Sequence, residues 1–217
     1  MINKKIVLFD LDGTLIDTAP DMYQALILLL REQGKTDVSY QDVRSQVSNG
    51  VLGVFSVAFN DDPKIEGERY NRYLDLYDSV SGKSSALFNN VNELLENLDS
   101  KDIHYGVVTN KSSRFAIPLI KKYKLYERLL TLVCGDEVKE KKPDPEPLFK
   151  AIEKTKFTYK RENIFYVGDA RKDIIAAKAA DFKSIACSYG YREDSDDPKL
   201  WSSDYLIDDL MEISEIV

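Results

Sequence analysis

Histidine and cysteine are scarce in this sequence of 217 residues, which has one histidine and two cysteines. Cys134 and Cys187 stand alone, without CxxC spacing, so we expect neither a disulfide framework nor a zinc site. His104 begins a predicted strand whose end, at Thr109, lies about 17 Å away at ~3.3 Å per residue. A histidine-ligated metal or a histidine triad at that end of the strand is therefore not expected.

Long apolar runs and an excess of positive charge are also absent. No run approaches the roughly 20 apolar residues that span a bilayer, and the N-terminal stretch reaches acidic residues too early for a signal peptide. The net charge of −7 argues against a surface for nucleic acid. No GxGxxG or Walker A sequence is present for a dinucleotide or ATP. We expect a cytoplasmic protein with a small-molecule substrate, either a monomer or a homodimer.

Short apolar runs separated by helical patterns predict the fold class. Continuous apolar runs of this length are typical of buried parallel strands. The helical patterns at 91–101 and 145–156 alternate with them, which predicts an α/β protein with a Rossmann-like parallel sheet. The predicted strands cover residues 5–10, 103–110, 130–136, 163–169 and 183–190.

Residues 17–84 differ, because they carry amphipathic helical patterns and no convincing strand. Thr18 and Asp21 stand in capping-box positions before a predicted helix that Gly34 ends. A stripe of Tyr70, Tyr73, Leu74 and Tyr77 favours helix packing, with ligand binding as the alternative. We therefore predict an inserted all-helical domain at 17–84 and a core domain formed by 1–16 and 85–217.

Polar residues occur where the predicted strands end. Ligands of open parallel sheets bind at the carboxyl ends of the strands, and these ends meet at one edge. Polar groups from several strands at one edge suit the binding of a phosphate or a metal ion. A single Asp at a strand end is weaker evidence, because Asp is also common in turns. The residues are Asp10, Thr109 with Asn110, Gly135 with Asp136, and Gly168 with Asp169.

Each local pattern alone also allows a purely structural interpretation. "DLDGT" (10–14) can be an Asp-Gly turn, but it does not fit an EF-hand calcium loop, whose glycine and glutamate positions hold Leu15 and Asp21. "GDARKD" (168–173) can be a strand end followed by a helix whose first turn Asp173 stabilises. "KKPDPEP" (141–147) can be a loop that leads into a helix.

Together and in this order, "DLDGT", "VVTN", "KKPDP" and "VGDARKD" resemble the four signature motifs of the haloacid dehalogenase-like hydrolase superfamily. The helical insertion after the first motif is similar to that superfamily's first type of cap domain. The resemblance covers nearly the whole chain and is nearest to the phosphoglycolate phosphatase-like subfamily. It implies a cap domain inserted in a haloacid dehalogenase-like core.

Phosphoryl transfer needs a nucleophile, charge neutralisation and help for the leaving group. Asp10 can be the nucleophile that forms an aspartyl-phosphate. Asp12 can protonate the leaving alcohol and then take a proton from the attacking water. The dehalogenases of the superfamily lack this second acid, so Asp12 favours a phosphate ester over a halide.

The resemblance implies the remaining roles. A Mg²⁺ ion would be held by the Asp10 carboxylate, the Asp12 backbone carbonyl and Asp169, with Asp173 in support. Thr109 and the backbone amide of Asn110 would bind the phosphate. Lys142 would offset the charge of Asp10 and the phosphoryl group. Lys111 and Lys141 are alternatives for this role, although we expect both to be solvated.

The substrate depends on the insertion. Its segment 43–51 resembles that of phosphoglycolate phosphatases, which implies substrate binding by Arg44, Asn49 and Gly50, although Ser48 stands where a glycine is common. Arg44 can also be a solvated helix residue, and Asn49-Gly50 a turn. Residues 189–208 resemble N-acetylmuramic acid 6-phosphate phosphatases. We therefore predict a phosphoric monoester hydrolase, with phosphoglycolate first and a sugar phosphate such as N-acetylmuramic acid 6-phosphate second.

Two other functions stay open as alternatives. A phosphomutase of the same fold would retain the aspartyl-phosphate, but it needs further acid-base groups that no pattern identifies. A non-enzymatic Asp-phosphate switch of the receiver type lacks an inserted domain and does not carry its aspartate on the first strand. A phosphatase would need the insertion to open and close, and we predict hinges near 15–19 and 80–86.

Overall fold

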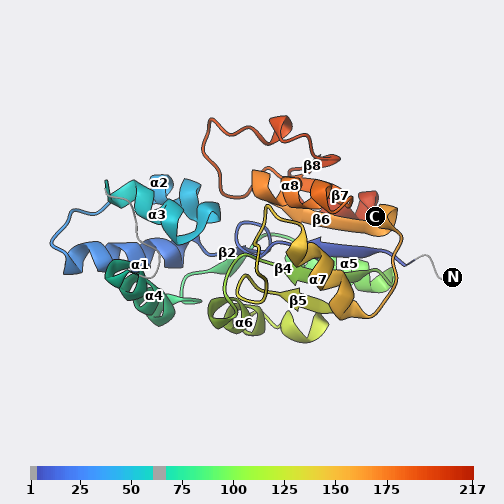
Figure 1. The fold of residues 1–217 in the computed structure, drawn as a ribbon, viewed down its shortest axis with the longest axis horizontal. Coiled ribbons are helices and arrows are strands. Elements are labelled where there is room, and N and C mark those ends of the chain that lie inside the picture. The colour runs from blue at the N-terminus through green and yellow to red at the C-terminus, as the bar shows by residue number, and fades with distance from the viewer. Residues whose placement is uncertain (1–3, 61–66) are drawn as a thin grey trace.

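The computed structural model describes residues 4–60 and 67–217 and is built around one six-stranded parallel sheet (Figure 1). The strand order is β5-β4-β1-β6-β7-β8, so β1 lies at the centre between β4 and β6. The strands are β1 Ile6–Phe9, β4 His104–Val108, β5 Thr131–Val133, β6 Ile164–Gly168, β7 Lys183–Cys187 and β8 Tyr205–Ile207.

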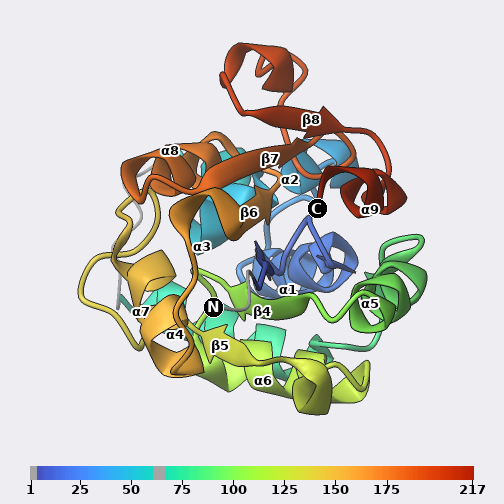
Figure 2. The same ribbon diagram turned by 90° about the vertical axis from the view of Figure 1, so that its right-hand side faces the viewer.

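Helices cover both faces of this sheet, because alternate residues of each strand point to opposite faces. Val7 and Phe9 of β1 pack with α5, α6 and α9, whereas Ile6 and Leu8 pack with α7 and α8 (Figure 2). The predicted α/β class with a parallel sheet is confirmed. These helices are α5 Val91–Ser100, α6 Ser113–Lys122, α7 Glu146–Thr155, α8 Arg171–Ala179 and α9 Ile213–Ile216.

The five predicted strands are all present, and the sheet has one strand more than was predicted. The five predicted runs all contain strands of the sheet, each shorter than its run because the polar ends lie beyond the last ladder pair. β8 adds a sixth strand that the apolar pattern does not reveal. It has three residues, and Tyr205 at its start is 38% exposed, so no continuous apolar run marks it.

The helical insertion lies at one end of the molecule, beyond the carboxyl ends of the strands (Figure 1). Its helices enclose a second apolar cluster, in which Leu26, Phe55 and Tyr73 are buried and which Phe115 and Tyr191 of the core also join. The predicted helix with the tyrosine stripe is present as α4. The helices are α1 Ala19–Glu32, α2 Tyr40–Gln46, α3 Gly50–Ala58 and α4 Glu68–Val80. Short 3₁₀ turns cover Val47–Asn49, Tyr126–Arg128, Arg161–Asn163, Pro198–Leu200 and Leu210–Glu212.

Two chain segments connect the insertion to the core, and they pair with each other. β2 Ile16–Asp17 and β3 Ala86–Leu87 form a two-stranded antiparallel ribbon. The separation of residues 17–84 as a domain stays our proposal, and this ribbon is where the proposed boundary falls. None of the helices among the described residues is long and apolar enough to cross a membrane.

The predicted capping box at the start of α1 is wrong. Thr18 is the N-cap residue of α1, but its side chain makes no capping hydrogen bond. Its hydroxyl donates instead to Asp12 Oδ1 at 2.6 Å. The Asp21 carboxylate accepts hydrogen bonds from the backbone amides of Gly82 (2.7 Å), Ser84 (2.8 Å) and Ser85 (3.1 Å). Both side chains are used in tertiary contacts that local sequence cannot show.

Candidate active site

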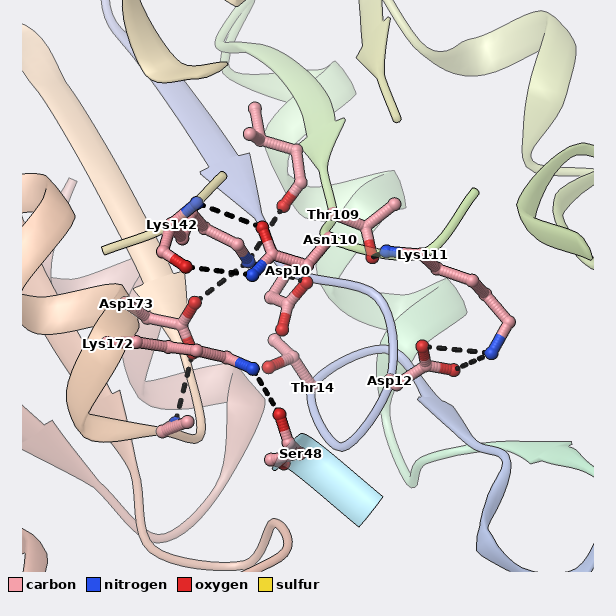
Figure 3. Close-up of polar contacts among 12 residues, drawn as sticks. Asp10, Asp12, Thr14, Ser48, Thr109, Asn110, Lys111, Lys142, Lys172 and Asp173 are labelled. Carbon is pink, nitrogen blue, oxygen red and sulfur yellow. Dashed lines mark hydrogen bonds and ion pairs between the residues drawn. The ribbon is translucent and has the colours of Figure 1, made fainter. Parts of the chain in front are cut away.

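The polar strand ends meet at the carboxyl edge of the sheet, beneath the helical insertion (Figure 3). Asp10 follows β1, Thr109 follows β4, Asp169 follows β6, and Asp173 lies in the first turn of α8. A cavity of about 480 Å³ opens above Asp10 and Thr109, and the insertion forms its other wall. In the sheet, β1 has β4 as its neighbour on one side and β6 on the other, so the chain continues in opposite directions from β1. In open parallel sheets, ligands bind at the carboxyl ends of the strands where the strand order reverses in this way.

Three buried carboxylates form the floor of the site. One oxygen from each of Asp10, Asp169 and Asp173 lies within 4.8 Å of the others. Burial and the charges of Asp173 and Asp10 raise the pKa of Asp169 to about 8. Burial also raises the pKa of Asp173, and repulsion from Asp10 adds to this effect while Lys142 opposes it. The cluster therefore carries more negative charge than its surroundings balance.

Lys142 is the cation nearest to this cluster. Its fully buried ammonium lies 2.8 Å from Asp10 Oδ1 and 2.8 Å from Asp173 Oδ1. Burial disfavours its charge, but the two carboxylates outweigh this effect and raise its pKa. The ammonium also donates to the Tyr166 hydroxyl (2.6 Å) and to the Val108 carbonyl (3.1 Å). These partners hold the amine beside Asp10, and its role in offsetting the phosphoryl charge remains a prediction.

The carboxylate cluster fits a hard divalent cation. Among the described residues, Lys142 is the ammonium in direct contact with these three carboxylates, with Lys172 acting on Asp173 from further away, and Mg²⁺ prefers carboxylate oxygens as ligands. Asp169 is also tightly seated, because a Cβ built on Gly13 would lie 2.1 Å from its Oδ2. Gly13 has a φ of +82°, which side chains rarely adopt, so the first motif needs glycine on both counts. The donor set thus suits Mg²⁺, which remains a proposal below.

The segment after β4 is joined to the Lys142 loop. The Asn110 side-chain amide donates to the Lys142 carbonyl (2.9 Å), and the Lys142 amide donates to Asn110 Oδ1 (3.0 Å). The buried Thr109 hydroxyl accepts from the Lys111 amide at 3.2 Å. Both predicted phosphate-binding residues line the cavity beside Asp10. The Asn110 side chain, which the sequence did not single out, fixes the loop that carries Lys142.

Lys111 is not solvated, which corrects the sequence-based expectation. Its side chain is 7% exposed, and its ammonium lies 3.0 Å from both carboxylate oxygens of Asp12. The ammonium also lies 4.9 Å from the centre of the Tyr77 ring in the insertion. Asp12 thus faces Lys111 and not the carboxylate cluster (Figure 3). Lys141 is exposed, as expected.

The predicted substrate-binding residues of the insertion divide into two groups. Asn49 and Gly50 line the cavity, whereas Arg44 is not among its lining residues. The Arg44 guanidinium lies 4.9 Å from the Tyr191 ring centre, and its Nη1 donates to the Gly190 carbonyl at 3.3 Å. In this arrangement Arg44 connects the insertion to the segment after β7. Its role in substrate binding remains a prediction.

The tyrosine stripe of α4 packs between helices, as the sequence favoured, and it also faces the cavity, so ligand binding stays an alternative. Tyr73 and Tyr77 are buried and stack with ring centres 6.3 Å apart. Tyr70, Tyr73, Leu74 and Tyr77 also line the cavity, together with Met22 of α1. Helix packing thus places an aromatic wall opposite Asp10.

Two other conspicuous residues lie away from the carboxylate cluster. Asp136, after β5, accepts hydrogen bonds from the backbone amide (2.8 Å) and hydroxyl (2.6 Å) of Ser113 at the start of α6. His104 begins β4 and contacts the Tyr159 hydroxyl at 2.5 Å. Neither lines the cavity above Asp10.

Comparisons with known proteins agree with this geometry. The model of the family described as "Haloacid dehalogenase-like hydrolase" matches residues 7–187. An N-acetylmuramic acid 6-phosphate phosphatase of Pseudomonas putida is 35% identical over 98% of this chain and 96% of its own. A phosphoglycolate phosphatase of Xanthomonas campestris pv. campestris is 35% identical over 94% of this chain and 92% of its own.

A solved structure gives the same result for the fold. The crystal structure of a predicted phosphoglycolate phosphatase from Haemophilus somnus 129pt superimposes with a TM-score of 0.86. The two sequences are 25% identical, and the match covers 100% of this chain and 99% of that one.

A parallel sheet that gathers carboxylates and a buried lysine beneath a helical insertion defines a hydrolase of the phosphatase class. The chain belongs to the haloacid dehalogenase-like hydrolase family. The predicted superfamily and the predicted phosphoric monoester hydrolase class are thereby confirmed.

Proposed function

We propose that the protein is a Mg²⁺-dependent phosphatase that hydrolyses a small phosphate monoester through an aspartyl-phosphate on Asp10. The observation that carries this proposal is the position of Asp10 at the floor of the cavity, 2.8 Å from the Lys142 ammonium and beside Asp169 and Asp173. A carboxylate nucleophile must approach an anionic phosphoryl group, so nearby positive charge lowers the barrier.

The first step is attack of a carboxylate oxygen of Asp10 on phosphorus, which breaks the bond to the leaving oxygen. Asp12 supplies the proton that the leaving alkoxide needs, and it takes a proton from the water that later attacks the aspartyl-phosphate. Lys111 lies against both oxygens of Asp12 and holds this carboxylate apart from the cluster around Asp10. Separating the two acids in this way gives them different environments, which suits different roles.

The residues proposed to hold Mg²⁺ are Asp10 and Asp169, with Asp173 in support and the Asp12 carbonyl as a further ligand. The bound ion would neutralise phosphoryl charge during transfer. Lys142, held by Tyr166 and Asp173, offsets the charge of Asp10 on the other side. Thr109 and the Asn110 amide are proposed to bind the phosphoryl oxygens.

Two substrates are candidates, and the cavity favours the larger. The sequence favours 2-phosphoglycolate, which has a two-carbon skeleton. The cavity of about 480 Å³ and its wall of Tyr70, Tyr73 and Tyr77 suit a sugar ring, whose apolar face can lie against aromatic side chains. We therefore place an N-acetylmuramic acid 6-phosphate-like sugar phosphate first and 2-phosphoglycolate second.

Access to the cavity is proposed to depend on motion of the helical insertion. Water must be excluded while Asp10 is phosphorylated and admitted afterwards. The segments near 15–19 and 80–86 contain the ribbon of β2 and β3, and we propose that they act as the hinge.

The test is phosphate release with Mg²⁺ across a panel of esters that includes 2-phosphoglycolate, N-acetylmuramic acid 6-phosphate and glucose phosphates. We expect one ester to be preferred by orders of magnitude in kcat/KM, and Asp10→Asn to be inactive. A trapped phosphoprotein that maps to Asp10 would establish the intermediate. An isomerised sugar phosphate without phosphate release would identify a mutase instead. Full activity in Asp10→Asn would overturn the mechanism.

A further inference from the structure

Ser48 of the helical insertion reaches the carboxylate cluster. It lies in the 3₁₀ turn Val47–Asn49, between α2 and α3, and lines the cavity. Its hydroxyl donates to Asp169 Oδ2 at 2.8 Å. Its backbone carbonyl accepts a hydrogen bond from Lys172, which lies beside Asp173 on α8 (Figure 3). One residue of the insertion therefore makes two contacts with the fourth motif.

The Asp169 carboxylate has few other partners in the described residues. Oδ2 also accepts the Tyr191 backbone amide at 2.8 Å, and Oδ1 faces the Thr14 hydroxyl at 3.5 Å. Tyr191 and Thr14 both lie outside residues 17–84, so Ser48 is the partner that the insertion supplies. A buried polar atom that loses its hydrogen-bond partner is costly, and Asp169 is fully buried.

Other polar contacts between the insertion and the segment after β7 do not reach the carboxylate cluster. The buried Tyr191 hydroxyl accepts hydrogen bonds from the backbone amides of Thr18 (2.6 Å) and Ala19 (3.1 Å), beside the proposed hinge. Gln46 donates to Glu193 in an exposed pair, and Arg44 meets the Gly190 carbonyl at 3.3 Å. Neither contact involves a member of the carboxylate cluster. The Ser48 contact thus connects the position of the insertion directly to a proposed metal-binding carboxylate.

We propose that Ser48 is a positioning residue that holds the helical insertion closed by binding the Asp169 carboxylate. Relatives with glycine at this position would lack the hydroxyl and hence this contact. Because the contact requires closure, Ser48 and Asp169 together, a variant that lacks Asp169 has no contact left for the Ser48 hydroxyl to lose. The inference concerns motion of the insertion and does not depend on which ester is hydrolysed.

The test measures closure without substrate, by the distance between two spin labels. Two exposed residues are replaced by cysteine for labelling. One is Gln41 on α2 of the insertion, and the other is Leu200, which lies in the core domain and is 70% exposed. The native Cys134 and Cys187 are buried and do not compete for the label. The ratio of open to closed populations is compared in wild type, Ser48→Ala and Ser45→Ala. Ser45 is a matched control, because its hydroxyl donates only to the Asp42 carbonyl in its own helix.

We expect Ser48→Ala to raise the ratio of open to closed molecules about tenfold, as loss of one buried hydrogen bond predicts. Ser45→Ala should match wild type. In an Asp169→Ala background the ratio should already be raised, and adding Ser48→Ala should change it less than about twofold.

Equal populations in Ser48→Ala and Ser45→Ala would overturn the inference. A tenfold effect of Ser48→Ala that persists undiminished in Asp169→Ala would also overturn it, because Ser48 would then act through another group. Failure of the proposed phosphatase function is separate, since it would appear as absence of phosphate release while the populations still shift.

Discussion

Lys111 and Asp12 form an ion pair in which the ammonium lies 3.0 Å from both carboxylate oxygens. The two residues are far apart in sequence and come from the loops after β4 and β1. Thr18 adds a third contact to Asp12 from the start of the helical insertion. The proposed acid-base group is therefore held by the core on one side and by the insertion on the other.

Replacement of Lys111 by Met should lower both activity and stability. Asp12 would lose its partner and its fixed orientation, so we expect kcat/KM to fall about 10- to 100-fold. Breaking a fully buried pair costs about 3–5 kcal/mol, but Asp12 is 17% exposed, so the expected loss is about 2 kcal/mol. Urea unfolding and initial rates measure the two effects. Lys141 is exposed and lines the same cavity, so Lys141→Met serves as the control and should change stability by less than ~0.5 kcal/mol. Equal effects of the two variants would contradict the role of the ion pair.

The sheet and its functional edge were predictable because they depend on local patterns. Strands such as β1 and β6 are buried on both faces, so they are continuous apolar runs, and the acids that follow them are conspicuous. Parallel strands bring their carboxyl ends to one edge, which is why Asp10 and Asp169 could be expected to meet. Neither inference requires knowledge of distant contacts.

The errors and omissions concern side chains whose partners are far away in sequence. Lys111 was expected to be solvated because nothing near it in sequence shows Asp12. Asp21 looked like part of a helix cap because its real partners follow α4. Tyr166 lies within an apolar strand, where a tyrosine is indistinguishable from a core residue until its hydroxyl is seen against Lys142. Only the tertiary fold supplies these pairings.

The stability of the metal-free protein should depend on pH through Asp169. Its pKa is about 8 in the folded protein because of burial, Asp173 and Asp10, against ~3.9 when unfolded. Between these values the folded state holds a proton that the unfolded state has released. This bound proton stabilises the folded state fully below about pH 4. As pH rises through about 8 the stabilisation is lost, and the free energy of unfolding falls by at most ~1.4 kcal/mol per pH unit.

Urea unfolding from pH 5 to 8 in EDTA measures this dependence, and Asp169→Asn isolates it because the amide does not titrate. The wild type should lose stability relative to the variant as pH rises. Added Mg²⁺ should stabilise the wild type at pH 8 much more than the variant, since it binds only the folded state. Parallel stability curves for the two proteins would show that the Asp169 pKa is not raised.

Asp21 should stabilise the junction between insertion and core. Its buried carboxylate accepts hydrogen bonds from the amides of Gly82, Ser84 and Ser85, so Asp21→Ala leaves these donors without partners. The expected loss is about 3 kcal/mol, with faster amide exchange at 82–85. Asp42→Ala, which removes an exposed acid from the first turn of α2, should cost about 0.5 kcal/mol. Unchanged exchange at 82–85 would argue against the contact.

Gly190→Ala should weaken the proposed Mg²⁺ site without touching a ligand. A Cβ at Gly190 would lie 2.1 Å from Asp169 Cβ and 2.5 Å from its Oδ2. Asp169 would have to move, so we expect Mg²⁺ affinity, measured by calorimetry, to fall at least ~10-fold, as for other changes in the support of a metal ligand. Overpacking should cost about 1–3 kcal/mol in stability.

The control for this experiment is Gly34→Ala. Gly34 has a φ of +64° and no atom within 4 Å of a built Cβ, so its replacement costs backbone strain of about 1 kcal/mol and no steric overlap. It lies after α1, outside the residues that line the cavity. Mg²⁺ affinity should therefore be unchanged in Gly34→Ala. If Gly190→Ala bound Mg²⁺ as tightly as this control, Asp169 would not be the ligand that the packing of Gly190 holds in place.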